Sequence, residues 1–415
     1  MNKQANRYIS LFPWYSGLTS DLLFYIAIDT LFLTMVKNFT AAEIVSITSL
    51  SQFACIALQF PILFIIRKIG NTASMRTGAF FLLLSAVFTT VFKAYWLVLL
   101  GRIFHDVAGI FKSASVVALE NNLDLTDRRG EFVRVRTAAN TVYAVITMLI
   151  SFVAGFMFNY NNYLPMFGCI ATCTLGFILT LFMKDSSSYN RISYKNKANT
   201  KVKIHFNKLI VVALVLYSLY YSIVTNGQNE GKLFIQQTIQ LDFDKETTAL
   251  IISGIVIFTR VVRVVSNLIF DKLYKKYQDK MGVALPSLLF SSLSVVLFGS
   301  FIPQVIVKIG VMALGYTIIL FIRDPFRLYM QDVLFTSTPK EQHQTLLTLL
   351  EFGVKIATAG IGLCFSAILL KYPMSVIIAM MIGITVIQIV LSVILYRAIL
   401  VGRAQKKDSQ SLLEL

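Results

Sequence analysis

Charged residues are scarce in this sequence. Only 14% of its 415 residues are Asp, Glu, Lys or Arg, and 56% are hydrophobic, whereas a soluble domain averages about 25% charged residues. This shortage excludes a soluble globular protein and indicates an integral membrane protein. A cleavable signal peptide is also missing, because Met1 to Ser10 is polar and the first apolar run, Leu11 to Val36, is too long for a signal-peptide core.

Histidine, cysteine and nucleotide-binding motifs are sparse or absent. The three histidines are His105, His205 and His343. They lie far apart, and no Ser or Cys nucleophile motif accompanies them, which argues against a membrane enzyme. The four cysteines are Cys55, Cys169, Cys173 and Cys364. All lie in apolar segments, so we interpret them as packing residues and expect no metal site and no cofactor. No P-loop is present to drive transport with ATP.

Long apolar runs dominate the remainder of the chain. Hydropathy predicts twelve membrane spans: Leu11 to Val36, Ile44 to Ile66, Thr77 to Phe92, Tyr95 to Leu119, Val133 to Phe158, Tyr163 to Met183, Leu209 to Ile235, Thr247 to Phe270, Val283 to Ile302, Val305 to Gln331, Gln344 to Leu370 and Met374 to Leu400. The sequence therefore predicts an all-α membrane protein with twelve transmembrane helices. The even number places both termini on the same side.

Basic residues give the net charge of +17 and lie mainly in the loops of one side. The opposite loops hold mainly Lys37, Lys93, Lys245, Lys308 and Lys371. This asymmetry follows the positive-inside rule. It predicts cytoplasmic termini and a multi-pass protein of the plasma membrane, and it removes nucleic acid as a partner.

The longest polar interruption, Lys184 to Asn207, leaves six spans on either side. We expect a six-helix bundle over 1–183, a cytoplasmic basic linker over 184–207, and a second six-helix bundle with a short cytoplasmic tail over 208–415. Transporters built from repeated halves bind their substrate where the halves meet near the midplane. We expect a monomer.

The fourth span carries four ionisable residues, Arg102, His105, Asp106 and Lys112. Each charge at the centre of a spanning helix costs roughly 2.5 to 3.5 kcal/mol on insertion scales, so these groups should face the interior of a bundle or a wet cavity. Two interpretations stay open. The residues either bind solute and protons or form a structural ion pair between helices.

The first span carries Asp21, Tyr25 and Asp29 at intervals of four residues. On one continuous helix the two carboxylates would lie roughly 12 Å apart along the axis. A carboxylate in a low-dielectric cavity has a raised pKa, which suits a proton carrier. Asp29 is the preferred candidate, and Asp21 could instead pair with a basic neighbour.

The second half offers further candidates. In the seventh span Tyr217 and Tyr221 precede Asn226 and Glu230. Either a glycine-interrupted helix lines a cavity here, or the helix ends near Asn226 and a solvated outer loop follows. Farther along the chain, Arg260, Arg323 and Asp324 also fall within apolar segments.

Two loops contain a related motif. The loop after the second span reads LFIIRKIGN, and the loop after the eighth reads NLIFDKLYKK. With the twelve spans, they resemble the major facilitator superfamily, whose loop between helices 2 and 3 carries G-x-x-x-D-(R/K)-x-G-(R/K)-(R/K). That loop is a conformational latch in the family. The resemblance implies this role for the matching residues Lys68, Gly70, Asp271 and Lys272.

The family resemblance extends to the fourth span. Arg102 resembles the Arg of the R-x-x-Q-G motif in proton-coupled members, which implies a part in coupling, while His105 and Asp106 differ from the motif and can titrate. Ile28, Asp29 and Thr30 resemble an acidic motif of drug exporters. The Gly-Pro signature of antiporters is missing from Met148 to Phe158. The direction of transport therefore stays open, with export slightly favoured.

These observations predict a secondary transporter that moves a small solute by alternating access and is coupled to protons. Intramembrane Arg and Lys slightly outnumber the acids, which permits an anionic, zwitterionic or peptide-like substrate. A transporter-like lipid flippase and a membrane sensor that does not transport are the alternatives.

Overall fold

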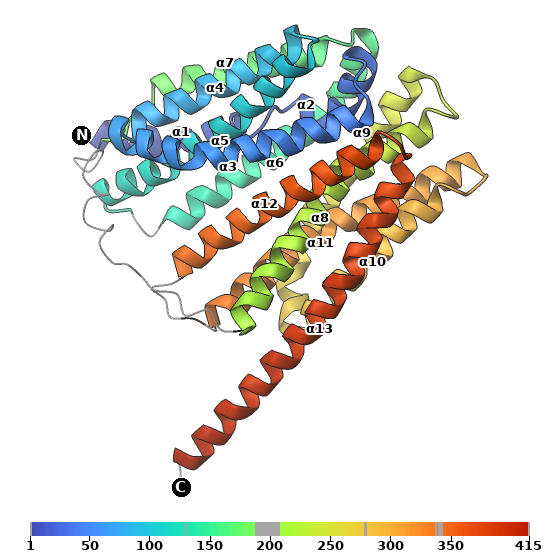
Figure 1. Cartoon of the computed structure of the whole chain (residues 1–415). Coiled ribbons are helices and arrows are strands. Elements are labelled where there is room, and N and C mark those ends of the chain that lie inside the picture. Colours follow the sequence, from blue (N-terminus) through green and yellow to red (C-terminus); the bar gives the residue numbers. More distant parts are fainter. Residues whose placement is uncertain are drawn as a thin grey trace. The chain divides into compact units, whose positions relative to one another are not determined.

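The computed structural model of the chain describes residues 2–128, 131–186, 208–277, 280–336, 338 and 343–413. All regular secondary structure in these ranges is helical (Figure 1). The helices divide into two compact units, which comprise Met1–Lys201 with Asp244–Ile257 and Val202–Phe243 with Phe258–Leu415. We call them unit 1 and unit 2. Of the predicted linker, 187–207 lies outside the described residues, so the predicted domain boundaries remain a prediction.

Unit 1 contains α1 (Asn2–Leu18), α2 (Tyr25–Leu31), a π-helical turn η1 (Phe32–Val36), α3 (Ala41–Ile69), α4 (Asn71–Val91), α5 (Tyr95–Leu125), α6 (Phe132–Tyr160) and α7 (Leu164–Leu181). α5 packs against α3 and α4, α1 packs against α6, and α4 packs against α7. One core cluster includes the fully buried side chains of Tyr8, Met75 and Leu119. This packing places α1 beside the helix that carries most of the intramembrane charges.

Unit 2 contains α8 (Lys208–Ile239), α10 (Met281–Gly299), α11 (Val305–Thr336), α12 (His343–Leu369) and α13 (Met374–Leu413). α9 (Lys245–Tyr277) contributes its first residues to unit 1 and the remainder to unit 2. α8 packs against α11, α12 and α13, and α10 packs against α11 and α13. α13 continues as a helix beyond Leu400, the predicted end of the last span (Figure 1).

Local sequence signals explain several helix ends. Thr40 and Glu43 form a capping box at the start of α3, in which each side chain accepts a hydrogen bond from the backbone N–H of the other residue. Gly70 alone separates α3 from α4, and it does so at a φ of 84°. Because a side chain is strained in that region, a glycine is needed for this direct turn.

The predicted all-α membrane fold is confirmed. Nine helices among the described residues are long and apolar enough to cross a membrane. Every predicted span coincides with one described helix except the first, where a continuous helix was wrong. That span is divided into α1, a break over Thr19 to Phe24, and α2 with η1.

Candidate functional site

The break in the first span is built from side chains that compete with the helical backbone. The hydroxyl of Thr19 donates to the carbonyl of Tyr15 (2.7 Å), and that of Ser20 donates to the carbonyl of Ser16. The carboxylate of Asp21 then accepts from the N–H of Leu22 (2.9 Å). Such local bonds offer the chain an alternative to the helix. The cluster Thr19, Ser20 and Asp21 was the sequence signal for the break, and hydropathy alone misses it.

Lys112 of α5 caps the end of α1. Its ammonium donates to the Ser16 carbonyl (3.2 Å) and to the Ser20 hydroxyl (2.8 Å). A cation at a helix C-terminus satisfies carbonyls that have no intrahelical partner and opposes the negative end of the helix dipole. Lys112 therefore stabilises the break directly. On the other side of the break, the backbone N–H of Tyr25 donates to the Cys169 sulfur (3.2 Å) and attaches the start of α2 to α7.

His105 joins two carboxylates. Its Nε2 lies 3.0 Å from Oδ1 of Asp21, and its Nδ1 lies 3.3 Å from Oδ1 of Asp106. The side chains of His105 and Asp106 are each 16% exposed, and that of Asp21 is 32% exposed. A carboxylate oxygen is an acceptor, and only the protonated imidazole has a proton on both nitrogens. The geometry therefore suits the protonated ring, which links α5 to the break.

Arg102 lies one turn before Asp106 on α5. The carboxylates of Asp106, Asp21 and Asp29 all interact with it electrostatically. Its Nε and Oδ2 of Asp106 are buried and have no hydrogen-bond partner among the described residues. Buried polar atoms rarely stay unsatisfied, so these two atoms are candidate partners for a polar group of a bound molecule or for water. At Gly109, on the same helix, an added Cβ would meet no atom within 4 Å.

Three carboxylates, the Arg102 guanidinium, the Lys112 amine and one imidazole thus share one region of unit 1. Asp29 lies on α2, and its Oδ1 accepts from the N–H of Thr30 (2.6 Å). The expectation that Asp21 and Asp29 lie on one continuous helix was wrong, because Asp21 lies in the break and Asp29 lies beyond it. The net charge of this group falls by one when His105 loses a proton.

Unit 2 has a second polar group, centred on Arg323 of α11. Its Nε donates to the Tyr221 hydroxyl (3.2 Å), and its Nη1 donates to Oε1 of Gln228 (3.0 Å). The Tyr221 ring stacks on Tyr217 with 5.4 Å between centroids. The Tyr316 hydroxyl donates to the Gln228 carbonyl (3.0 Å). Gln228 and Tyr316 connect α8 to α11 and were not among the predicted site residues.

A stripe of buried polar side chains follows α8. Ser222, Asn226 and Glu230 are spaced by four residues, and each is at most 2% exposed. Ser222 Oγ, Asn226 Nδ2 and Glu230 Oε2 each lack a hydrogen-bond partner among the described residues. α8 is continuous through this region, so of the two alternatives the outer loop after Asn226 is wrong. Gly227 and Gly231 do not interrupt the helix; they face Ile319 and Tyr316 of α11.

The remaining predicted residues lie in different places. Arg260 is half-buried on α9 and makes no hydrogen bond or ion pair with a described residue, and Asp324 is half-buried on α11 and has a partner. Lys68 is exposed at the end of α3. The side chains of Asp271 and Lys272 lie outside the described part of the chain.

Asp185 is an anchoring residue that the sequence analysis missed. Its buried carboxylate accepts from the side-chain amides of Asn71 (2.8 Å) and Asn121 (2.9 Å), and its backbone N–H donates to the Thr72 hydroxyl (3.0 Å). These bonds attach the chain after α7 to the first turn of α4 and to α5. A lone acid at the start of a basic segment was the available signal.

Long apolar helices with ionisable groups buried inside each unit are typical of membrane proteins that handle polar solutes or ions. Residues 14–334 match the sequence model of the Major Facilitator Superfamily. The chain therefore belongs to this family, and the predicted family is confirmed. It is a multi-pass membrane transporter rather than an enzyme.

Solved structures give the same fold. A nucleoside transporter, NupG, has a TM-score of 0.70 and 11% identity, with 95% of this chain and 98% of that chain covered. A point mutant of NupG has a TM-score of 0.68 and 11% identity, with 97% and 99% covered. A bacterial homologue of the iron transporter ferroportin, in an inward-facing state, has a TM-score of 0.62 and 11% identity, with 94% and 98% covered. A search of curated protein sequences found no match.

Proposed function

We propose that this transporter moves a small polar solute by alternating access and couples the movement to protons through His105. The observation that carries the proposal is the contact of one imidazole with both Asp21 and Asp106. Asp21 belongs to a break in a membrane span and Asp106 to an intact helix. Because His105 itself lies on α5, its contact with Asp21 is the one that joins the two elements, and a proton on the ring strengthens that contact.

Deprotonation has a defined local consequence. A neutral imidazole carries one N–H, so one of the two contacts at His105 loses its hydrogen bond. The group of charges around it then has a surplus carboxylate in a region of low dielectric. The loss of the positive charge weakens the attachment of α5 to the break in either tautomer, and the hydrogen bond to Asp21 is also lost when the remaining proton is on Nδ1. A local change in charge of this kind can shift the balance between two conformations of a transporter.

The solute is a polar molecule with at least one hydrogen-bond acceptor and one donor. Arg102 Nε offers a donor, and Asp106 Oδ2 offers an acceptor, and both are without a partner in the described structure. An anionic or zwitterionic solute matches the guanidinium. Such a molecule would change the field at His105 when it binds, which links occupation of the site to the proton.

We further propose a monomer in the plasma membrane, with cytoplasmic termini and export as the direction. The charge asymmetry of the loops supports the orientation. The likeness of Ile28, Asp29 and Thr30 to an exporter motif supports the direction.

Proteoliposomes test the function. The purified chain is reconstituted with a pH-sensitive dye inside, and proton movement is followed after addition of amino acids, dipeptides, small carboxylates or nucleosides. We expect one of these classes to drive proton movement in the wild type and in the control Lys93→Gln, and not in Asp21→Asn. Solute flux that is equal with and without a pH gradient would overturn proton coupling. Vesicles loaded with the active solute give the direction.

A further inference from the structure

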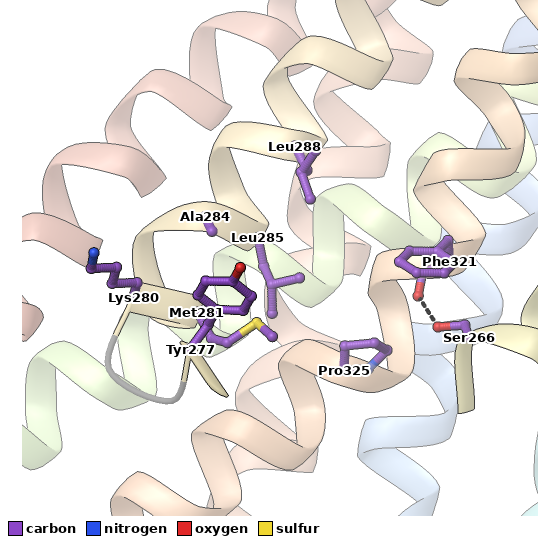
Figure 2. A pocket seen from close by; sticks show the side chains of 9 residues that line it. All are labelled: Ser266, Tyr277, Lys280, Met281, Ala284, Leu285, Leu288, Phe321 and Pro325. Carbon is purple, nitrogen blue, oxygen red and sulfur yellow. Dashed lines mark hydrogen bonds between the residues drawn. The ribbon is translucent and has the colours of Figure 1, made fainter. Parts of the chain in front are cut away.

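A pocket of about 310 Å³ lies in unit 2 where α9 ends and α10 begins, against the side of α11 (Figure 2). Its deep part is lined by apolar side chains, including Met281, Leu285 and Phe321. Leu288 and Ala284, on α10, also line it and are both exposed. The volume is at the lower end of the range for ligand pockets, so it can hold part of one acyl chain but no large molecule.

A missing backbone bond shapes the wall of the pocket. Pro325 has no N–H to donate to the carbonyl of Phe321 four residues earlier. The buried Ser266 hydroxyl of α9 donates to that carbonyl instead (2.7 Å), as Figure 2 shows. This bond occupies the proton of the Ser266 hydroxyl, which lines the deep part of the pocket. A polar ligand would therefore find no free donor in the deep part, whereas a hydrocarbon chain needs none.

One basic residue, Lys280, lines the pocket, and other lysines precede it in the sequence. Lys280 is exposed, and Tyr277 is 43% exposed. The Lys276 ammonium lies 5.2 Å from the centroid of the Tyr277 ring. The segment 271–280 contains four lysines and two aspartates. Basic pockets between transmembrane helices on the cytoplasmic side are suited to anionic lipid headgroups.

We propose that this pocket binds an anionic phospholipid. One acyl chain occupies the apolar part, and the phosphate is bound by the Lys280 ammonium and the Tyr277 hydroxyl at the membrane surface. Lys and Tyr at this depth place polar ends among the headgroups while their apolar parts contact the chain. The predicted orientation places the site in the cytoplasmic leaflet. The site shares no residue with the His105 region, so it is independent of the proposed solute transport.

Native mass spectrometry of the full-length protein in detergent tests the proposal by titration with dioleoylphosphatidylglycerol or dioleoylphosphatidylcholine. We expect one saturable phosphatidylglycerol site, with at least tenfold higher affinity than for phosphatidylcholine. Lys280→Gln should remove this preference, and Ala284→Trp should weaken phosphatidylglycerol binding at least tenfold by filling the pocket. The control is Lys371→Gln, an exposed lysine elsewhere in unit 2, which should bind as the wild type does.

Leu288→Asp provides a second variant if Ala284→Trp does not fold, because it places a charge in the acyl-chain path. Normal phosphatidylglycerol binding by the folded pocket variants would overturn the site. Equal affinity for the two lipids, or an unchanged preference in Lys280→Gln, would overturn recognition of the headgroup. Inorganic phosphate should not displace the lipid, and complete displacement would show that the acyl chain contributes nothing.

Discussion

Nε2 of His105 lies 3.0 Å from Oδ1 of Asp21, so a side chain in the middle of α5 is attached to a non-helical part of the first membrane span. Non-helical backbone is tolerated at membrane depth only where protein or a wet cavity surrounds it. The attachment therefore supports the break and also makes it sensitive to the charge of one ring.

Replacing His105 should abolish proton coupling and leave solute binding intact. His105→Gln keeps a donor and an acceptor but cannot titrate. We expect exchange of solute across the membrane to continue, while the stimulation by a pH gradient disappears; coupling between two sites is commonly about 5- to 150-fold. Counterflow and gradient-driven uptake in the same proteoliposomes measure the two activities. A variant that keeps its stimulation would contradict the role of His105.

Arg102 balances several carboxylates. Removing one member of a buried charged group costs about 3 to 5 kcal/mol, because the partners stay buried and uncompensated. We therefore expect Arg102→Gln to lower the thermal midpoint markedly and to abolish solute binding, and Arg102→Lys to recover part of the stability. The control is Arg128→Gln, which removes an exposed pair with Glu131 (2.7 Å) and should leave both unchanged. Equal stability of Arg102→Gln and wild type would argue against this balance.

Replacing Glu230 should have the opposite effect on stability to replacing Arg102. A buried carboxyl oxygen without a partner costs about 1 to 3 kcal/mol. We expect Glu230→Met to melt at the same or a higher temperature than the wild type, and to transport less if the stripe on α8 serves the solute. Ser222→Ala, in the same stripe, shows the effect of removing a neutral polar group. A large loss of stability in Glu230→Met would mean that the carboxyl has a structural role.

The buried ammonium of Lys37 should make the stability of the chain depend on pH. Lys37 follows η1, outside the first span, and its ammonium donates to the carbonyls of Thr90 and Phe92 (2.8 Å each). Burial and the nearby Lys93 ammonium lower the pKa of Lys37 to about 8, whereas an unfolded chain has a Lys pKa of about 10.4. The folded chain then binds fewer protons between these values, so stability should rise with pH in this window.

Thermal unfolding in detergent measures this rise. Relative to Lys37→Met, the wild type should gain stability as the pH increases from about 8 to about 10, by a few kcal/mol at most. Lys93→Gln removes a neighbouring positive charge and should move the gain to higher pH. Parallel curves for wild type and Lys37→Met would contradict the lowered pKa.

Several features could be predicted because they depend on composition and local pattern. The scarcity of charge identifies a membrane protein, and Lys68 and Gly70 with Asp271 and Lys272 indicate the family. The concentration of Arg102, His105, Asp106 and Lys112 in one span identified the part of unit 1 that has most intramembrane charge. The division of roles among them was not predictable, because Lys112 caps α1 and His105 contacts Asp21, and both partners are distant in sequence.

The sequence by itself determined that the chain is a helical membrane transporter of the Major Facilitator Superfamily, because hydropathy and loop motifs are properties of consecutive residues. Tertiary structure alone decided that Lys112 and His105 of α5 hold the break in the first span, that α8 stays continuous through Glu230, and that Pro325 and Ser266 shape an apolar pocket. Each of these outcomes depends on hydrogen bonds or packing between residues distant in sequence, and no local pattern contains the identity of such partners.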